Sequence, residues 1–68
     1  MQIPQHVTDL INRGCPQQIA EHLTDEGDKT LQFDGQWYVV SGFQGEEYFE
    51  SEFTSLDPAI AFYKSVEV

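Results

Sequence analysis

The side chains best suited to catalysis are Cys15, His6 and His22, the single thiol and the two imidazoles of the chain. A cysteine acts as a nucleophile when a histidine in hydrogen-bond contact takes its proton. We expect both histidines to lie on short helices, with Cys15 near the start of the second. Nothing in their spacing requires contact, so an enzyme using Cys15 and a histidine is the third-ranked hypothesis, and no catalytic residue is predicted.

A second group of reactive side chains is the acidic run Asp25, Glu26 and Asp28 around Gly27. Carboxylates can bind a metal ion, but their spacing here does not match an EF-hand loop, whose ligands recur at alternate positions and end in a distant glutamate. We therefore predict a solvated acidic turn, with no metal site and no cofactor.

Several aromatic and acidic side chains lie between residues 37 and 52, and this mixture is the most informative feature for binding. A sheet face that carries aromatic anchors beside charges is typical of a docking surface. The predicted protein-interaction face consists of Trp37, Val39, Phe43, Glu46, Tyr48, Glu50 and Glu52. An ordinary solvated face, with glutamates that discourage aggregation, is the competing interpretation.

Three antiparallel strands would carry this face, at residues 30–33, 37–43 and 47–54. An Asp-Gly pair at 34–35 favours a two-residue hairpin loop, because glycine and aspartate tolerate the positive φ angles of that turn. A Gln-Gly pair at 44–45 is a weaker signal of the same kind. The sequence thus predicts a three-stranded meander.

Two-residue loops determine which side chains share a face, because side chains alternate along a strand. Phe33 would face Gln36, and Phe43 would face Glu46. The resulting core face is Leu31, Phe33, Tyr38, Val40, Phe49 and Phe53. Bulges at both glycines would instead gather Leu31, Trp37, Val39, Phe49 and Phe53 and leave Tyr38 and Tyr48 outside. Both cores remain open from sequence, and the Asp-Gly pair favours the first.

Three helices are predicted at about residues 4–13, 16–24 and 58–66. Apolar residues recur at helical spacing in each segment, proline suits the first turn of each, and Gly14 ends the first helix. The predicted order is helix, helix, strand, strand, strand, helix. This order describes a single α+β domain over residues 1–68, with two layers and helices on one sheet face only.

Charge narrows the range of partners. Twelve carboxylates stand against three Lys and Arg residues, for a formal net charge of −9. Direct binding to nucleic acid or to an anionic membrane is not expected, because both depend on basic side chains. A basic partner would be attracted. A lone cysteine, the lack of a signal-peptide pattern and the lack of a membrane-spanning apolar run predict a cytoplasmic protein.

Together these observations predict a small acidic domain without enzymatic activity. We expect it to bind another protein, with a basic surface, as a regulator or adaptor, or to bind itself as a homodimer. The alternative is a DNA-mimic inhibitor of a nucleic-acid-binding protein, of the kind found in mobile elements. That alternative would use carboxylate rows spaced roughly like DNA phosphates.

Overall fold

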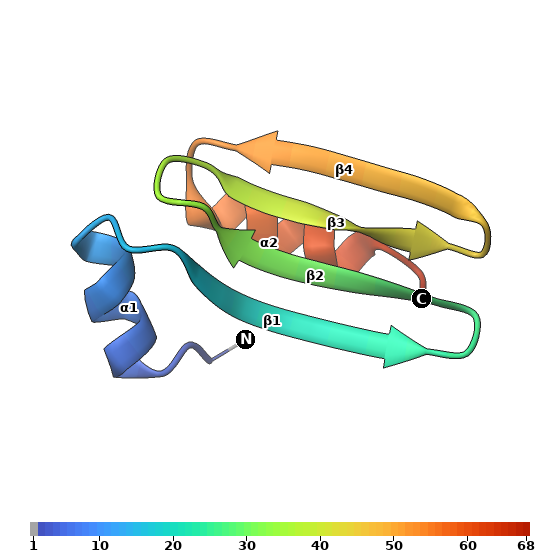
Figure 1. Cartoon of the computed structure of the whole chain (residues 1–68), viewed down its shortest axis with the longest axis horizontal. Helices are drawn as coiled ribbons and strands as arrows, with labels where there is room; N and C mark the ends of the chain where they lie inside the picture. The colour runs from blue at the N-terminus through green and yellow to red at the C-terminus, as the bar shows by residue number, and fades with distance from the viewer. Residues whose placement is uncertain (1) are drawn as a thin grey trace.

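A computed structural model describes residues 2–68 as a four-stranded antiparallel sheet with two helices. The elements are α1 (Gln5–Asn12), β1 (Gln17–Thr24), β2 (Gly27–Phe33), β3 (Tyr38–Gln44), β4 (Glu47–Phe53) and α2 (Leu56–Ser65) (Figure 1). The strand order is β1-β2-β3-β4, so each strand pairs with the next in the chain. The α+β class is as predicted, but the meander has four strands in place of three.

The segment predicted as a second helix, residues 16–24, is the strand β1. Its pairing with β2 shifts between Gln18 and Ala20, so Ile19 is an extra residue in a β-bulge. Consequently Ile19 and Ala20, although adjacent in sequence, both pack against the core. Ile19, Ala20 and Leu23 have the spacing of an apolar helix face, which led to the helix prediction. Pairing with β2 outweighs this local preference.

A tight turn joins β1 to β2 at the acidic run, where the sequence predicts a solvated turn but no hairpin. The hydroxyl of Thr24 accepts hydrogen bonds from the backbone N–H groups of Glu26 and Gly27, at 3.2 and 3.1 Å, and donates one to the Gly27 carbonyl at 2.9 Å. Because this network closes the chain on itself, β2 begins at Gly27, earlier than the predicted residue 30.

Both predicted hairpin registers are wrong by two residues. Phe33 pairs with Tyr38 rather than with Gln36, and Phe43 pairs with Tyr48 rather than with Glu46. At the first turn the Asp34 carboxylate accepts the N–H groups of residues 36 and 37 at 2.8 and 2.7 Å, which holds a longer loop. Each error is an even number of residues, so every strand side chain stays on its predicted face.

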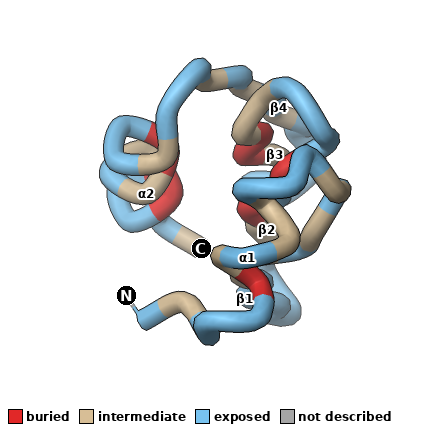
Figure 2. The backbone as a smooth tube through the Cα atoms, turned by 90° about the vertical axis from the view of Figure 1, so that its left-hand side faces the viewer, coloured by how far each residue is buried: buried red, intermediate tan, exposed pale blue. Residues whose placement is uncertain are grey.

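The core lies between the sheet and α2, which covers β2, β3 and β4 on one side (Figure 2). Leu31, Val40 and Ala59 are fully buried. The predicted core face, Leu31, Phe33, Tyr38, Val40, Phe49 and Phe53, is the face that packs there. The alternative core, built on Trp37 and Val39, does not form.

Helix α2 begins at Leu56, two residues before the predicted start, with Ser55 at its N-cap. Its C-terminal end is held by Lys29 of β2. The ammonium group donates hydrogen bonds to the carbonyls of Tyr63 and Val66, at 2.8 and 3.0 Å, and lies 4.5 Å from the centre of the Tyr63 ring. One of the three basic side chains is thus engaged inside the fold.

Helix α1 packs beside β1 and not in the layer of α2, contrary to the prediction that all helices share one face. It ends as predicted at Gly14, whose φ is 80°. The Cys15 N–H then reaches back to the Leu10 carbonyl at 2.9 Å, as expected when glycine closes a helix C-terminus. Neither helix of residues 2–68 is long and apolar enough to cross a bilayer.

Candidate protein interface

Helix α2 covers one side of the sheet, and within residues 2–68 no other element covers the opposite side (Figures 1 and 2). We call this side the open face. Strand pairing and alternation place three cross-strand rows on it: Leu23, Asp28, Phe43 and Tyr48; Glu21, Thr30, Ser41 and Glu50; and Gln18, Gln32, Val39 and Glu52. The first row therefore combines three large apolar side chains with Asp28, and the other two rows add Glu21, Glu50 and Glu52.

The first row lies at the end of the sheet where the β1–β2 and β3–β4 turns meet. Leu23, Phe43 and Tyr48 are the large hydrophobic side chains that remain exposed, at 66%, 44% and 58%. The Phe43 and Tyr48 rings contact each other edge to face, with centroids 5.3 Å apart. The pair forms a single aromatic ridge that remains partly exposed to solvent.

The middle row places a carboxylate directly against this ridge. The Tyr48 hydroxyl donates a hydrogen bond to Glu50 at 3.0 Å, and this bond raises the pKa of the phenol. Thr30 and Ser41 lie between Glu50 on β4 and Glu21 on β1. The aromatic ridge and a carboxylate therefore form one connected unit.

In the third row, Val39 was predicted as an interface residue but is buried. Val39 occupies a central strand between Gln32 and Glu52, and it is only 6% exposed. A side chain surrounded by neighbours on both adjacent strands has little surface left for a partner. Glu52 stays exposed at the edge strand. Of this row, Glu52 and the glutamines can contact a ligand, whereas Val39 supports the face from within.

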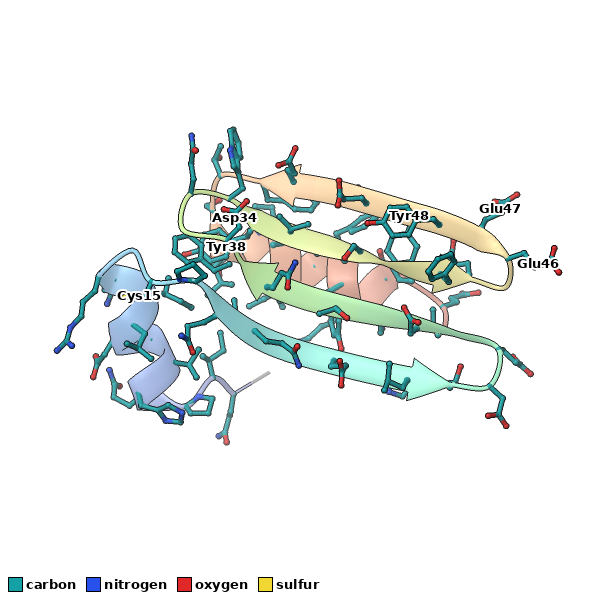
Figure 3. The ribbon with its side chains drawn as sticks, viewed as in Figure 1. Cys15, Asp34, Tyr38, Glu46, Glu47 and Tyr48 are labelled. Atoms are coloured by element: carbon teal, nitrogen blue, oxygen red, sulfur yellow. The ribbon has the colours of Figure 1, made fainter. Side chains whose placement is uncertain are left out.

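Trp37 and Glu46 do not lie on the strands of the open face, although both were predicted there. Trp37 is half-buried in the β2–β3 loop, and its backbone N–H donates a hydrogen bond to the Asp34 carboxylate. Glu46 is exposed in the β3–β4 turn, at the other end of the sheet (Figure 3). The longer first loop and the displaced second turn moved both residues out of the predicted rows.

Four residues of the open face lie outside the predicted strands: Gln18, Glu21, Leu23 and Asp28. The first three were assigned to a helix, and Asp28 to a solvated turn. A turn signal was available, because Thr24 is followed three residues later by Gly27, and glycine is favoured at the last position of a type I turn. Recognition of that turn would have placed a strand on each side of it.

A shallow hollow adjoins the aromatic ridge. It lies between the two neighbouring turns and is lined by Thr24, Asp25, Glu26, Gly27, Asp28, Phe43, Gly45 and Glu46. The Gly45 N–H donates a hydrogen bond to the Glu26 carbonyl at 3.0 Å, which joins the turns. Among residues 2–68, no three His, Cys, Asp or Glu side chains are grouped closely enough to hold a metal ion.

The charged side chains of the open face are all negative. They are Glu21, Asp28, Glu50 and Glu52, and its three rows contain no lysine or arginine. Lys29 is on the covered side and bonded to α2, whereas Arg13 and Lys64 belong to the ends of α1 and α2. The face is therefore negative around an apolar ridge.

The cysteine and histidines are not assembled into one group. Cys15 precedes β1, whereas His22 lies near the far end of that strand. Six residues lie between them, five of which belong to β1, so they are about 20 Å apart along the strand direction. Because β1 is a strand, no helix begins at Cys15. His6 is exposed on the first turn of α1.

No protein-family model matches this sequence, and searches of curated proteins and of solved structures also return no match. Function is therefore inferred from the chemistry of the open face. Its aromatic ridge and its carboxylates are the features that distinguish it from the rest of the surface.

Proposed function

We propose that this chain is a small binding domain, without enzymatic activity, that contacts another protein through the open face. The observation that supports the proposal is the joint exposure of Leu23, Phe43 and Tyr48 in one row. Interfaces combine aromatic anchors with a polar, charged rim. Leaving three large apolar side chains in water has no benefit for folding, and a partner that covers them would gain the free energy of their burial.

The dimensions of the face agree with a reversible contact. Four strands of seven or eight residues make a surface of about 14 to 19 Å by about 23 Å. A partner that covers only this face would form an interface smaller than those of stable complexes, in the size range of weak and transient contacts. A transient contact is compatible with the role that we propose, a regulator or adaptor.

A homodimer through this face is the less favoured arrangement. Two copies placed open face to open face would bring Glu50 and Glu52 of one near the carboxylates of the other, with no basic residue on either face. Like charges across an interface oppose association. A partner of different composition is therefore the preferred occupant.

The experiment is affinity capture from the native host with three versions of the chain. We expect the wild type to retain a partner and the double variant Phe43→Ala, Tyr48→Ala to lose it. The matched control is Lys64→Ala, Glu67→Ala, which changes two exposed residues near the end of α2. Circular dichroism must show that all versions are folded. Retention of the same partner by the folded Phe43, Tyr48 variant would refute the proposal.

A second candidate is a DNA mimic, and it is supported by the carboxylates that alternate on β4. Glu50 and Glu52 project from the same side of that strand about 6.5–7 Å apart, with Tyr48 before them. A nucleic-acid-binding partner would release the chain when duplex DNA is added. Capture that DNA does not disturb would exclude this candidate and leave the general binding role in place.

A further inference from the structure

We propose that the segment of the partner that occupies the open face is basic, with arginine or lysine side chains that stack on the Phe43–Tyr48 ridge and pair with Glu50. This inference rests on the proposed binding function and specifies the chemistry of the partner. Its basis is the combination of an exposed aromatic pair, a carboxylate that accepts a hydrogen bond from the hydroxyl of Tyr48, and the lack of basic residues on the face.

Charge complementarity is the first argument. The ionised side chains of the open face are all carboxylates. Lys29, the one lysine of the sheet strands, points to the covered side, where it binds α2. An acidic or neutral segment would leave these carboxylates without a counter-charge. A basic segment would neutralise them and would also be steered toward the face as it approaches.

The geometry at Tyr48 is the second argument. An aromatic ring attracts a cation over its face, and a neighbouring carboxylate adds a charged hydrogen-bond acceptor. Glu50 provides that acceptor, 3.0 Å from the Tyr48 hydroxyl. An arginine can stack on the ring and reach the carboxylate at once, because its guanidinium is planar and carries several donors.

The protein already contains a cation–aromatic contact of this kind on the covered side. The Lys29 ammonium lies 4.5 Å from the centre of the Tyr63 ring and is also bonded to backbone oxygens. On the open face the ring and the oxygen acceptor are present in Tyr48 and Glu50, and the cation is the component that a partner would supply. The comparison indicates which ligand chemistry the exposed site lacks.

The hollow beside the ridge also combines an aromatic ring with carboxylates. Phe43 forms part of its lining together with Asp25, Glu26, Asp28 and Glu46. A long basic side chain can lay its methylene groups on the phenyl ring and direct its charged end toward these carboxylates. A second cation of the segment would therefore find a place at the turn end of the sheet.

The probe is a short synthetic peptide in which two arginines flank a leucine, so that the cations recur at alternate positions as Glu50 and Glu52 do. Its control replaces both arginines with citrulline, which has a similar shape but no charge. Binding is measured by isothermal titration calorimetry at low and high salt. We expect the arginine peptide to bind, its affinity to fall as salt increases, and the citrulline peptide to bind at least about tenfold more weakly.

Matched variants locate the site. Glu50→Gln and Glu47→Gln both remove one exposed charge from β4, but Glu47 pairs with Gln44 and points to the opposite side of the sheet. We expect Glu50→Gln to weaken arginine-peptide binding about fivefold and Glu47→Gln to change it by less than about twofold. Tyr48→Leu keeps an apolar side chain, removes the aromatic ring, and should also weaken binding.

Several results would overturn the inference. Equal losses from Glu50→Gln and Glu47→Gln would mean attraction to net charge only. Equal binding of the arginine and citrulline peptides would mean an apolar ligand, and a dimer in sedimentation experiments that Phe43→Ala disrupts would mean that a second copy occupies the face. If the arginine peptide fails to bind while the Phe43, Tyr48 variant still loses its host partner, the proposed function stands and this inference fails.

Discussion

The two faces of the sheet are built from the same strands, yet they differ in cover, exposure and charge. On the side of α2, Leu31 and Val40 are fully buried in an apolar core. On the open face, Phe43 and Tyr48 are 44% and 58% exposed beside carboxylates. Aromatic side chains occur on both sides, so aromatic content does not distinguish core from interface. The neighbouring charges, and the presence or absence of α2, make the distinction.

The difference has an energetic consequence. For a chain of 68 residues we expect a free energy of unfolding of about 5 kcal/mol or less. The covered face supplies most of the buried apolar area, because it is the face that contacts α2. Substitutions on the covered face should therefore affect folding, whereas those on the open face should affect binding.

The largest expected effect is the loss of a core side chain. Leu31→Ala should reduce the free energy of unfolding by about 3 kcal/mol, because it leaves a cavity at a fully buried site. The matched change on the open face, Phe43→Ala, should cost less than about 1 kcal/mol. Urea denaturation followed by circular dichroism measures both. Similar losses for the two variants would show that the open face also sustains the fold.

The second prediction concerns Gly42, which lies on the covered side between Lys29 and Phe49. A Cβ atom there would collide with the Asp28 carbonyl of β2, and the φ angle of 155° is also unfavourable for other residues. Gly42→Ala should destabilise the protein by about 2 kcal/mol.

Gly45→Ala is the control for this effect. Gly45 has a φ of 66°, but a Cβ atom would meet no atom within 4 Å. Its replacement should cost only the strain of a left-handed backbone, about 1 kcal/mol. Equal costs in thermal denaturation would show that the contact with Asp28 is unimportant and that φ alone matters at both sites.

The third prediction compares the contributions of Lys29 and Lys64 to stability. Lys29→Met should reduce stability by about 1–2 kcal/mol, because α2 loses two charged hydrogen bonds to its C-terminal carbonyls. Lys64→Met removes an equal charge from an exposed position and should cost less than about 0.5 kcal/mol. Chemical denaturation of the two variants compares them. A larger loss for Lys64→Met would contradict the assignment of Lys29 as the group that holds α2.

The fourth prediction concerns how the stability of the protein changes at acidic pH. The backbone N–H groups of Trp37 and Gln36 lower the pKa of Asp34, so its ionised form stabilises the folded state. That contribution is present above the ordinary carboxyl pKa and is lost as the pH falls through the lowered value. Asp34→Ala should remove this part of the acid dependence in thermal denaturation. An unchanged pH profile would show that the loop does not depend on the carboxylate.

The smallest expected effect is spectroscopic. The hydrogen bond to Glu50 raises the pKa of Tyr48, so the protonated phenol is favoured in the folded state and its contribution is lost as the pH rises through the raised value. Glu50→Ala should bring the Tyr48 pKa down toward its ordinary range. Ultraviolet titration of tyrosinate, with Tyr48→Phe to identify the signal, measures the change. A titration curve unaffected by Glu50→Ala would show that the two side chains are not bonded in solution.

The sequence by itself determined the class of fold, the membership of the covered face and the acidic, aromatic character of the opposite face. Alternation along a strand depends only on local backbone geometry, and the register errors were even numbers of residues. Leu31, Phe33 and Val40 were therefore assigned to the core although their partners were wrong.

Tertiary structure decided the rest. Whether residues 17–24 form a helix or a strand depended on pairing with β2 and on the bulge at Ile19, because apolar spacing there suited either form. The side chains of Asp34 and Thr24 set the lengths of their turns through specific hydrogen bonds. Those turns placed Leu23 in the same cross-strand row as Phe43 and Tyr48, an arrangement of distant segments that no local pattern encodes.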